Sequence, residues 1–477
     1  MFAAAMLCGA LSWRTANALP ASFESDGSTP AEVFETMSAQ RVPAAAVSFI
    51  VLDAATGRVV ASHEADTPRS PASTLKVLTT FASLETLGPN YTWHTRALIR
   101  GEIDDGVLDG DLILKGGGDP YMTLERWWGF ARMLRNRGLG TIHGDIVIDD
   151  TDFSLPNVDP GAFDGRPNRS YNVPPDGLMV NFQSVDFTVF ANAGARRVEI
   201  IADPSPVNLK IENHVRYADG RCSGAARRVE FEVAGEDWDR VVFSGTLSRH
   251  CAARSISRVL LKPAPYAYGT FVALWHELGG EFSGKLRIEA AGAGAQPFAT
   301  YDSLTLAEVV RLTNKFSNNL MARHLLLTMG LERFGIPGTM EKGATSVAEW
   351  SRSRGIDLGD VDLDNGSGLS RTTHISVRTL ANVLYAAYHS PYAPEFISSL
   401  PLGGFDGTLR TRFKGTAGGT VRLKTGHLDG VSGVAGYVTG ANARRYVVVC
   451  LVNHARADYG AGEPIHAALV QWVLDHP

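Results

Sequence analysis

The sequence predicts an α/β domain that is built from both ends of the chain and interrupted by a large β-rich insertion. Strand-like runs occur near the N-terminus and again near the C-terminus, and helical patterns lie between them. The chain changes character at about residue 91, and from 190 to 260 it consists mostly of short β-rich runs. Terminal strands can share one sheet, so we expect residues 91–296 to be inserted into one α/β domain.

The first elements are a predicted hairpin and a buried helix. Ala46–Asp53 and Arg58–His63 are strand-like runs joined by Ala-Ala-Thr-Gly, a sequence typical of a turn. After Pro71, the segment Ser73–Leu87 carries apolar residues broadly at helical spacing among other apolar residues. This pattern predicts a helix that is buried on most sides.

The insertion is expected to begin with strands and a helix-like stretch, and the chain returns to helices and strands after it. Asp111–Lys115 leads into a glycine-rich turn, and Ala291–Ala295 has the composition of a junction. The remaining predicted elements are a helix-like stretch at Trp127–Asn136, a strand-like run at Thr141–Ile148, helices at Leu304–Thr313, Asn319–Met329, Val377–Tyr388 and Ile465–Leu474, and a strand meander of Val421–Thr425, Val434–Val438 and Tyr446–Val452.

Length and composition indicate a multidomain globular protein. A chain of 477 residues exceeds what one hydrophobic core usually spans, which predicts two or three domains. Hydrophobic residues make up 44% and charged residues 20%, and the net charge is −5. The chain has no basic surplus, which argues against a dedicated nucleic-acid binder.

The N-terminus predicts export. Phe2–Leu11 is almost wholly apolar, and Ala16-Asn17-Ala18 places small residues where a signal peptidase reads. We therefore expect a signal peptide at residues 1–18 and a mature chain starting near Leu19, although no Lys or Arg precedes the apolar run. The alternative is a buried N-terminal helix. No later stretch is long and apolar enough for a membrane span, so the mature protein is expected to be soluble; peripheral membrane association and oligomeric state stay open.

Three cysteines remain in the mature chain. Cys450 lies in a continuous β-branched run, which predicts a packed, inert thiol. Cys222 and Cys251 flank a strand-rich stretch, and an oxidising compartment would permit a disulfide between them.

Three short motifs occur in a fixed order, namely Ser73-Thr-Leu-Lys76, Ser317-Asn318-Asn319 and Lys424-Thr425-Gly426. Each motif is weak alone, and a second Ser-x-Asn occurs at Ser170–Asn172 in a proline-rich turn region. Their order and their local settings make the combined signal strong. The sequence therefore predicts a serine nucleophile activated by a lysine.

The first motif has a consistent physical reading. Ser73 falls at the start of a buried helix, where free N–H groups favour a developing anion. Lys76 lies one turn further on the same face, and a partly desolvated lysine can accept the hydroxyl proton. The alternative is that Ser73 caps the helix and that Lys76 is a solvated residue beside it. The apolar neighbours of Lys76 argue against this, because a charge without a function among them would cost free energy.

The other two motifs are expected to complete the site. Ser317 and Asn319 straddle the start of a helical run and could project into a cleft, or could simply form a cap or turn. Lys424 and Thr425 lie on a strand, and Gly426 would let a substrate backbone approach that strand's edge. The alternative for Lys424 is a charge that protects a sheet edge.

Together these residues resemble the superfamily of penicillin-binding proteins and serine β-lactamases. The chain is most similar to the class C low-molecular-mass penicillin-binding proteins, the D-alanyl-D-alanine carboxypeptidase/endopeptidases. The likeness extends over most of the mature chain and includes Pro71–Lys76, Gly117–Pro120, Gly144–Asp149, Tyr171–Pro175, Val180–Phe182, Asp364–Arg371 and Lys424–Gly426.

The resemblance implies a fold and a domain plan. The fold is an antiparallel sheet flanked by helices, as in penicillin-binding and β-lactamase-like transpeptidase domains. The implied division is a catalytic domain of residues 19–90 plus 297–477, an accessory domain II of residues 91–190 plus 259–296, and an accessory domain III of residues 191–258.

The resemblance also implies site roles. Ser73 would attack the bond between two D-alanines, with Lys76 as general base, Ser317 as proton relay and Asn319 positioning the substrate amide. Further implied roles are the binding of the terminal carboxylate by Lys424 and Thr425 with help from Arg371, an oxyanion hole formed by the N–H groups of Ser73 and His427, and an acidic group for the substrate's amine at Asp164. The implied partners are peptidoglycan peptides and β-lactams, in the periplasm or cell envelope, with no cofactor and no metal.

Two departures from the family pattern bear on recognition. His427 stands where a small hydroxyl residue is usual, and Asp429 stands where an uncharged polar residue is expected. Both are expected to affect carboxylate recognition or the balance between exopeptidase and endopeptidase action.

Two other functions compete with this one. A serine β-lactamase needs a positioned Glu followed shortly by Asn, and none of Glu332, Glu341, Glu349 or Glu395 has an Asn within the next four residues. A non-catalytic wall-binding protein could keep the fold, but retention of all three motifs argues against it.

Overall fold

The computed structural model describes residues 30–156, 159–415 and 419–475. The predicted signal peptide and the predicted mature N-terminus near Leu19 lie outside these residues. Within them, no helix has the length and apolar character needed to cross a bilayer.

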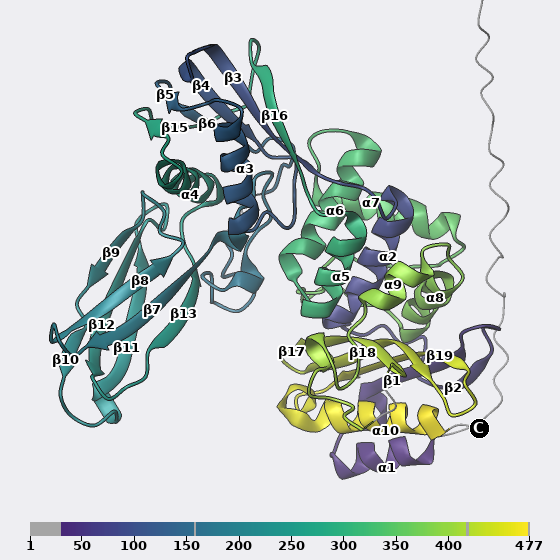
Figure 1. The fold of residues 1–477 in the computed structure, drawn as a ribbon. Helices are drawn as coiled ribbons and strands as arrows, with labels where there is room; N and C mark the ends of the chain where they lie inside the picture. The colour runs from purple at the N-terminus through teal and green to yellow at the C-terminus, as the bar shows by residue number, and fades with distance from the viewer. Residues whose placement is uncertain (1–29, 157–158, 416–418, 476–477) are drawn as a thin grey trace, which may run out of the picture.

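The two ends of the chain meet in one antiparallel sheet, which confirms the predicted fold class. Its strand order is β17-β18-β19-β1-β2 (Figure 1). The strands are β1 (Val47–Asp53), β2 (Val59–His63), β17 (Val421–Leu428), β18 (Val431–Thr439) and β19 (Arg445–Asn453). β1 pairs with β19 over its full length, so the N-terminal hairpin is joined directly to the C-terminal meander.

Helices cover both faces of this sheet. One face carries α1 (Ala31–Ala39) and α10 (Gly462–Asp475), and the other carries the larger helical layer (Figure 1). That layer contains α2 (Lys76–Leu87), α5 (Leu306–Phe316), α6 (Asn319–Phe334), α7 (Met340–Ser353), α8 (Val377–Tyr388) and α9 (Ala393–Ser399). Coverage on both faces explains why β19 is a continuous apolar run rather than an alternating one.

The first part of the insertion is a mixed sheet with two helices against it. Its strands are β3 (His94–Asp104), β4 (Val107–Lys115), β5 (Thr141–Ile142), β6 (Ile146–Asp149), β14 (Glu281–Phe282), β15 (Leu286–Ile288) and β16 (Gln296–Asp302), and its helices are α3 (Leu124–Asn136) and α4 (Pro263–Glu277). β16 pairs with β3, so the chain leaves and re-enters the domain of the five-stranded sheet along neighbouring strands.

The second part of the insertion is a pair of smaller sheets, of which β9 to β12 lie far from the five-stranded sheet (Figure 1). One contains β7 (Ser184–Asn192), β8 (Arg197–Asp203) and β13 (Arg254–Val259); the other contains β9 (Lys210–Asn213), β10 (Arg216–Ala218), β11 (Arg227–Ala234) and β12 (Arg240–Ser248). The rings of Phe187 and Phe243 meet edge to face at 5.0 Å between centroids, so the two sheets share an apolar interior.

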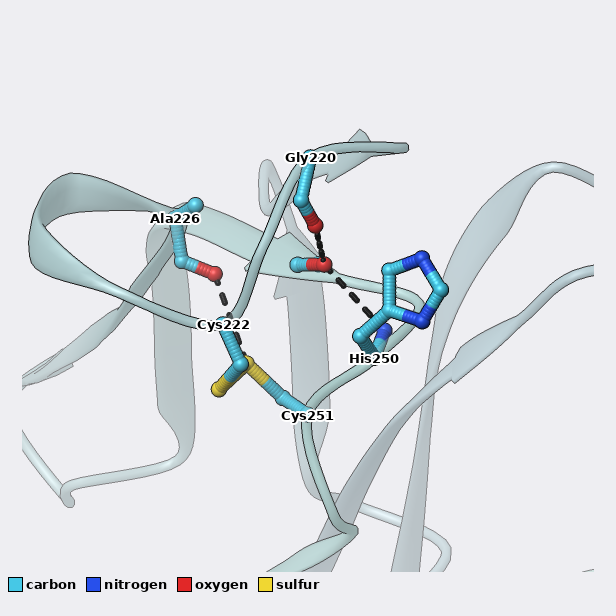
Figure 2. Close-up of a disulfide and its surroundings, with 6 residues drawn as sticks. Gly220, Cys222, Ala226, His250 and Cys251 are labelled. Atoms are coloured by element: carbon cyan, nitrogen blue, oxygen red, sulfur yellow. Dashed lines mark hydrogen bonds between the residues drawn. A yellow bond between two sulfur atoms is a disulfide. The ribbon is translucent and has the colours of Figure 1, made fainter.

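Both cysteine predictions are confirmed. A disulfide joins Cys222 and Cys251, which lie in the segments that follow β10 and β12 (Figure 2). Cys450 is a free, buried thiol on β19, and burial raises its pKa to about 12. A thiol with so high a pKa is unreactive at neutral pH.

Candidate active site

Ser73, the predicted nucleophile, lies on a short, firmly held turn before α2. The turn is a 3₁₀ segment, Ala72–Leu75, and Ala72 adopts a left-handed backbone with φ of 46°. The side chain of Asn453 accepts a hydrogen bond from the Ser70 N–H at 2.8 Å and donates one to the Ser70 carbonyl at 3.1 Å. Strand β19 therefore fixes the backbone three residues before the nucleophile, and the strained residue beside Ser73 aims its side chain.

Lys76 is fully buried and contacts three oxygen atoms. Its Nζ lies 2.9 Å from Ser73 Oγ, 2.7 Å from Asn319 Oδ1 and 2.6 Å from the Ser367 carbonyl oxygen. Burial, and then the positive charges of Lys424 and Arg323, hold the pKa of Lys76 well below its usual value. The side chain is therefore no solvated flank, and its amine can accept the Ser73 proton.

Lys424 forms a second buried cation beside Ser317. Its Nζ donates to Ser317 Oγ at 2.8 Å and to the Thr425 carbonyl at 2.7 Å, and burial lowers its pKa to about 7. β17 is an edge strand of the sheet, but Lys424 has no exposed surface, so it does not serve as a solvated charge that protects the edge.

The segment between α5 and α6 presents Ser317 and Asn319 to these lysines. Ser317 has a left-handed backbone with φ of 56°. The middle residue of the motif, Asn318, caps α6 by accepting from Met321 N at 3.0 Å, so neither Ser317 nor Asn319 is the cap. Asn319 is the first residue of α6, and its Nδ2 donates to the Tyr171 carbonyl of the insertion at 3.2 Å. The amide group thus connects Lys76 to the accessory region.

Thr425 and Gly426 have neighbours that the sequence did not predict. Thr425 Oγ1 lies 2.8 Å from Thr408 Oγ1 in the loop before β17. A side chain at Gly426 would place its Cβ 2.6 Å from the Pro71 carbonyl oxygen. The glycine therefore makes room for the nucleophile's own turn, whereas the sequence suggested that it makes room for a substrate.

Arg371, Asp164 and His427 lie around the site without contacting the buried lysines. Arg371 stacks on the Phe163 ring at 4.2 Å, and its guanidinium is 3.7 Å from Asp429. Asp164 accepts hydrogen bonds from the Tyr171 hydroxyl at 2.7 Å and from Asn172 Nδ2 at 2.8 Å. His427 is exposed on β17.

A cavity of about 430 Å³ lies between the insertion and the catalytic domain beside this site. Its walls come from the loop around Phe163, from Asn172, and from the segment of Asp364 to Arg371. Both Arg323 and Arg371 line it, so an anionic or extended ligand could enter here.

Sequence reasoning missed four contributors. The Ser367 and Tyr171 carbonyl oxygens are backbone atoms, which no side-chain pattern identifies. Arg323 lies on α6 one turn after Asn319 and donates to the Val173 carbonyl at 2.8 Å, so helical spacing from the motif could have found it. Thr408 lies in an irregular loop that gave no signal.

The fold and these residues define the class of penicillin-binding serine enzymes with a β-lactamase-like catalytic domain. Residues 31–475 match the family described as D-Ala-D-Ala carboxypeptidase 3 (S13). The chain belongs to this family, and it is a serine hydrolase.

Relatives of known name and a solved structure are consistent with this family. A D-alanyl-D-alanine carboxypeptidase from Actinomadura sp. (strain R39) is 28% identical over 453 residues, covering 89% of this chain and 81% of that protein. The D-alanyl-D-alanine carboxypeptidase DacB of Haemophilus influenzae is 26% identical and covers 85% of each chain. The crystal structure of penicillin binding protein 4 from H. influenzae superposes with a TM-score of 0.79 at 25% identity, covering 93% of this chain and 99% of that one.

Proposed function

We propose that this protein is an exported D-Ala-D-Ala carboxypeptidase and D,D-endopeptidase that cleaves peptidoglycan stem peptides through an acyl-enzyme on Ser73. The observation that carries the proposal is the fully buried Lys76 amine 2.9 Å from Ser73 Oγ, with a strongly lowered pKa. An uncharged amine at hydrogen-bond distance from a hydroxyl is the arrangement that general-base activation requires.

In the proposed acylation step, Ser73, Lys76 and Ser317 each handle a proton or a bond. Ser73 Oγ attacks the carbonyl carbon of the penultimate D-alanine while its proton passes to Lys76. The oxyanion of the tetrahedral intermediate is held by the N–H groups of Ser73 and His427. The C–N bond then breaks, and the leaving amine takes a proton through Ser317, which is hydrogen-bonded to Lys424. Water later attacks the ester, releases the shortened peptide and restores Ser73.

The remaining roles are assigned to recognition. Asn319 positions the substrate amide, Lys424 and Thr425 bind the terminal carboxylate, and Arg371 assists from the rim. The substrate backbone pairs with the edge of β17 from Lys424 to Leu428, beyond the stretch where Leu402 pairs with Arg422. Asp164 is assigned to an amine of the stem peptide, since it is half-buried and directly follows Phe163, which lines the cavity and stacks on Arg371.

The domain plan and the location belong to the same proposal. We assign residues 19–90 plus 297–477 to the catalytic domain, 91–190 plus 259–296 to accessory domain II and 191–258 to accessory domain III. The disulfide supports an oxidising compartment such as the periplasm or cell envelope. Protein recovered from the envelope should begin near Leu19, and cytoplasmic protein that retains Met1 would contradict export.

Two measurements test the function. Fluorescent penicillin should label Ser73, as located by peptide mapping, and Ser73→Ala should abolish the label. Mass spectrometry of monomeric and cross-linked muropeptides should show loss of terminal D-alanine and cleavage of cross-links. Rapid penicillin turnover without muropeptide products would indicate a β-lactamase, and absence of labelling would indicate a non-catalytic wall-binding protein.

A further inference from the structure

The distal end of the accessory sheets carries a concentration of arginine in a chain that is acidic as a whole. Segments 214–228 and 246–254 together contain six arginines, at positions 216, 221, 227, 228, 249 and 254, and a single carboxylate, Asp219. The whole chain has 45 Lys and Arg against 50 Asp and Glu. The two segments, which we call the basic tip, therefore differ in charge from the rest of the molecule.

Strand pairing and the disulfide bring these arginines together. Arg216 on β10 and Arg228 on β11 are both paired with Thr246 of the strand between them, so their side chains leave the same face of the sheet. The Cys222–Cys251 bridge ties the two segments to each other (Figure 2). The Arg249 N–H also donates to the Ala218 carbonyl at 2.9 Å. The charge cluster is thus held by covalent and sheet structure.

Most of these arginines have no carboxylate partner. Asp219 is 2.6 Å from Arg196 and 3.8 Å from Arg249, and Arg228 is 3.6 Å from Glu230. Among the residues that the structure describes, no carboxylate lies within ion-pair distance of Arg216, Arg221, Arg227 or Arg254. Uncompensated cations gathered on one surface attract anions.

Part of the basic tip is hollowed. Arg227, Arg228 and Arg254 line an open depression of about 630 Å³ together with Gly224, Ala225 and Val229. Guanidinium groups bind carboxylates through two parallel hydrogen bonds, and three of them around one hollow can hold several carboxylates of one flexible ligand.

We propose that the basic tip binds carboxylate-bearing stem peptides of peptidoglycan away from the active site and so holds the enzyme on its polymer. This inference rests on the proposed function, because a substrate with many carboxylates per strand is the anion that the enzyme would meet at high density. A bilayer fits less well: in these two segments, which the structure describes in full, no large apolar side chain is exposed for insertion into lipid. A second, weak contact on a polymer raises the local concentration of cleavable bonds.

The test compares a charge reversal with a matched control in the full mature chain. The tip variant is Arg227→Glu/Arg228→Glu/Arg254→Glu, with an Arg→Gln set at the same positions in case reversal impairs folding. The control reverses three exposed arginines elsewhere, Arg41→Glu/Arg132→Glu/Arg352→Glu. Binding is measured in a Ser73→Ala background by co-sedimentation with insoluble peptidoglycan stripped of proteins and phosphate polymers, and with vesicles of phosphatidylglycerol and phosphatidylcholine.

We expect the tip variant to lose about tenfold or more in affinity for peptidoglycan, the Gln set to lose part of it, and the control to bind normally. Peptidoglycan whose carboxylates have been converted to amides should bind the unchanged tip weakly, and added salt should weaken native binding. Unaltered sedimentation of the tip variant, equal binding to amidated polymer, or a loss confined to vesicles would each overturn the inference.

Catalysis is followed separately with Ser73 intact, on a soluble peptide ending in D-alanyl-D-alanine. The tip variant should hydrolyse this peptide at the unchanged rate, because β10, β11 and β12, next to which the basic tip lies, are far from α2, the helix that directly follows the turn of Ser73 (Figure 1). A tip variant that loses soluble-peptide activity while still folded would overturn the separation of the two sites. Unchanged protein that binds peptidoglycan through the tip but never cleaves the peptide would support the inference and refute the proposed function.

Discussion

Lys76 and Lys424 are both buried lysines in one site, but the proposed mechanism requires opposite charge states of them. Lys76 contacts the nucleophile and must be neutral to accept a proton. Lys424 contacts Ser317 and must be charged to attract a carboxylate. The charge of Lys424 also disfavours protonation of Lys76 by repulsion, and that repulsion lowers the pKa of Lys76 further than burial alone.

Replacing Lys76 by arginine separates charge from basicity. A guanidinium stays protonated at any working pH, so Lys76→Arg should lose penicillin acylation by about 10²-fold or more while remaining folded. The measurement is the labelling rate alongside thermal unfolding. Near-normal labelling at unchanged stability would mean that Lys76 acts only as a charge.

Lys424 should produce the alkaline limb of the pH profile. Its pKa in the free enzyme is about 7, so kcat/KM for a D-alanyl-D-alanine peptide should fall as pH rises through that value and the ammonium is lost. The lowered pKa of Lys76 should produce the acid limb, since the amine becomes available as pH rises. Lys424→Arg should shift the alkaline limb upward; a limb that stays in place would assign it to another group.

At the scale of single elements, the loop before β17 connects the two halves of the site. Lys315, at the end of α5, reaches Asp406 Oδ1 at 2.9 Å and the Leu400 carbonyl at 2.7 Å, and it is almost fully buried. Two residues after Asp406, Thr408 hydrogen-bonds Thr425. The ion pair therefore ties the segment leading to Ser317 to the strand that carries Lys424.

Asp406→Asn should weaken that connection. The buried Lys315 charge would lose a charged partner whose own side chain is 38% exposed, at a cost of about 1–2 kcal/mol of unfolding free energy. KM for peptides ending in a free carboxylate should rise more than the penicillin labelling rate falls, because Thr425 loses its anchor. Asp429→Asn is the control, since Asp429 is 87% exposed and 3.7 Å from Arg371, and it should leave stability unchanged.

The sequence predicted elements best where periodicity was strong. Val377–Tyr388 was predicted with the bounds that α8 has, and the apolar runs of the C-terminal meander lie within β17, β18 and β19. Helix α4 was not predicted, because its sequence of aromatic residues, prolines and an internal glycine shows no clear helical spacing of apolar residues. Helix α7 was missed because small and polar residues dominate it.

Only part of the candidate site could be predicted from the sequence, and the reason is physical. Motif side chains can be recognised in the sequence by their residue type, and the structure does place Ser73 and Asn319 against the Lys76 amine. The Ser367 and Tyr171 carbonyls lie in segments that the resemblance marked, but their contacts with Lys76 and Asn319 depend on tertiary packing and could not be predicted from side-chain types. Likewise, the role of Gly426 depends on how closely β17 approaches Pro71.

At the scale of the whole molecule, the insertion forms part of the active site rather than a separate attachment. The Tyr171 carbonyl accepts from Asn319, the Val173 carbonyl accepts from Arg323, and Phe163 stacks beneath Arg371. The loops of the insertion therefore wall one side of the cavity beside Ser73, while its distal sheets extend away from the catalytic domain (Figure 1).

This arrangement predicts that the distal sheets can be destabilised without loss of catalysis. The Cys222–Cys251 bridge closes a sequence separation of 29 residues, and its removal in Cys222→Ala/Cys251→Ala should cost about 3–4 kcal/mol if chain entropy dominates. Hydrogen exchange should accelerate in peptides from β10 to β12, while the rate of penicillin labelling at Ser73 stays the same, because no residue of the bridge contacts the site. Cys450→Ala is the matched control: it removes a buried thiol from β19, so its effect should appear in the catalytic sheet and in the overall unfolding temperature instead. A fall in labelling rate in the double variant that equals the fall in distal protection would show that the sheets and the active site unfold as one cooperative unit.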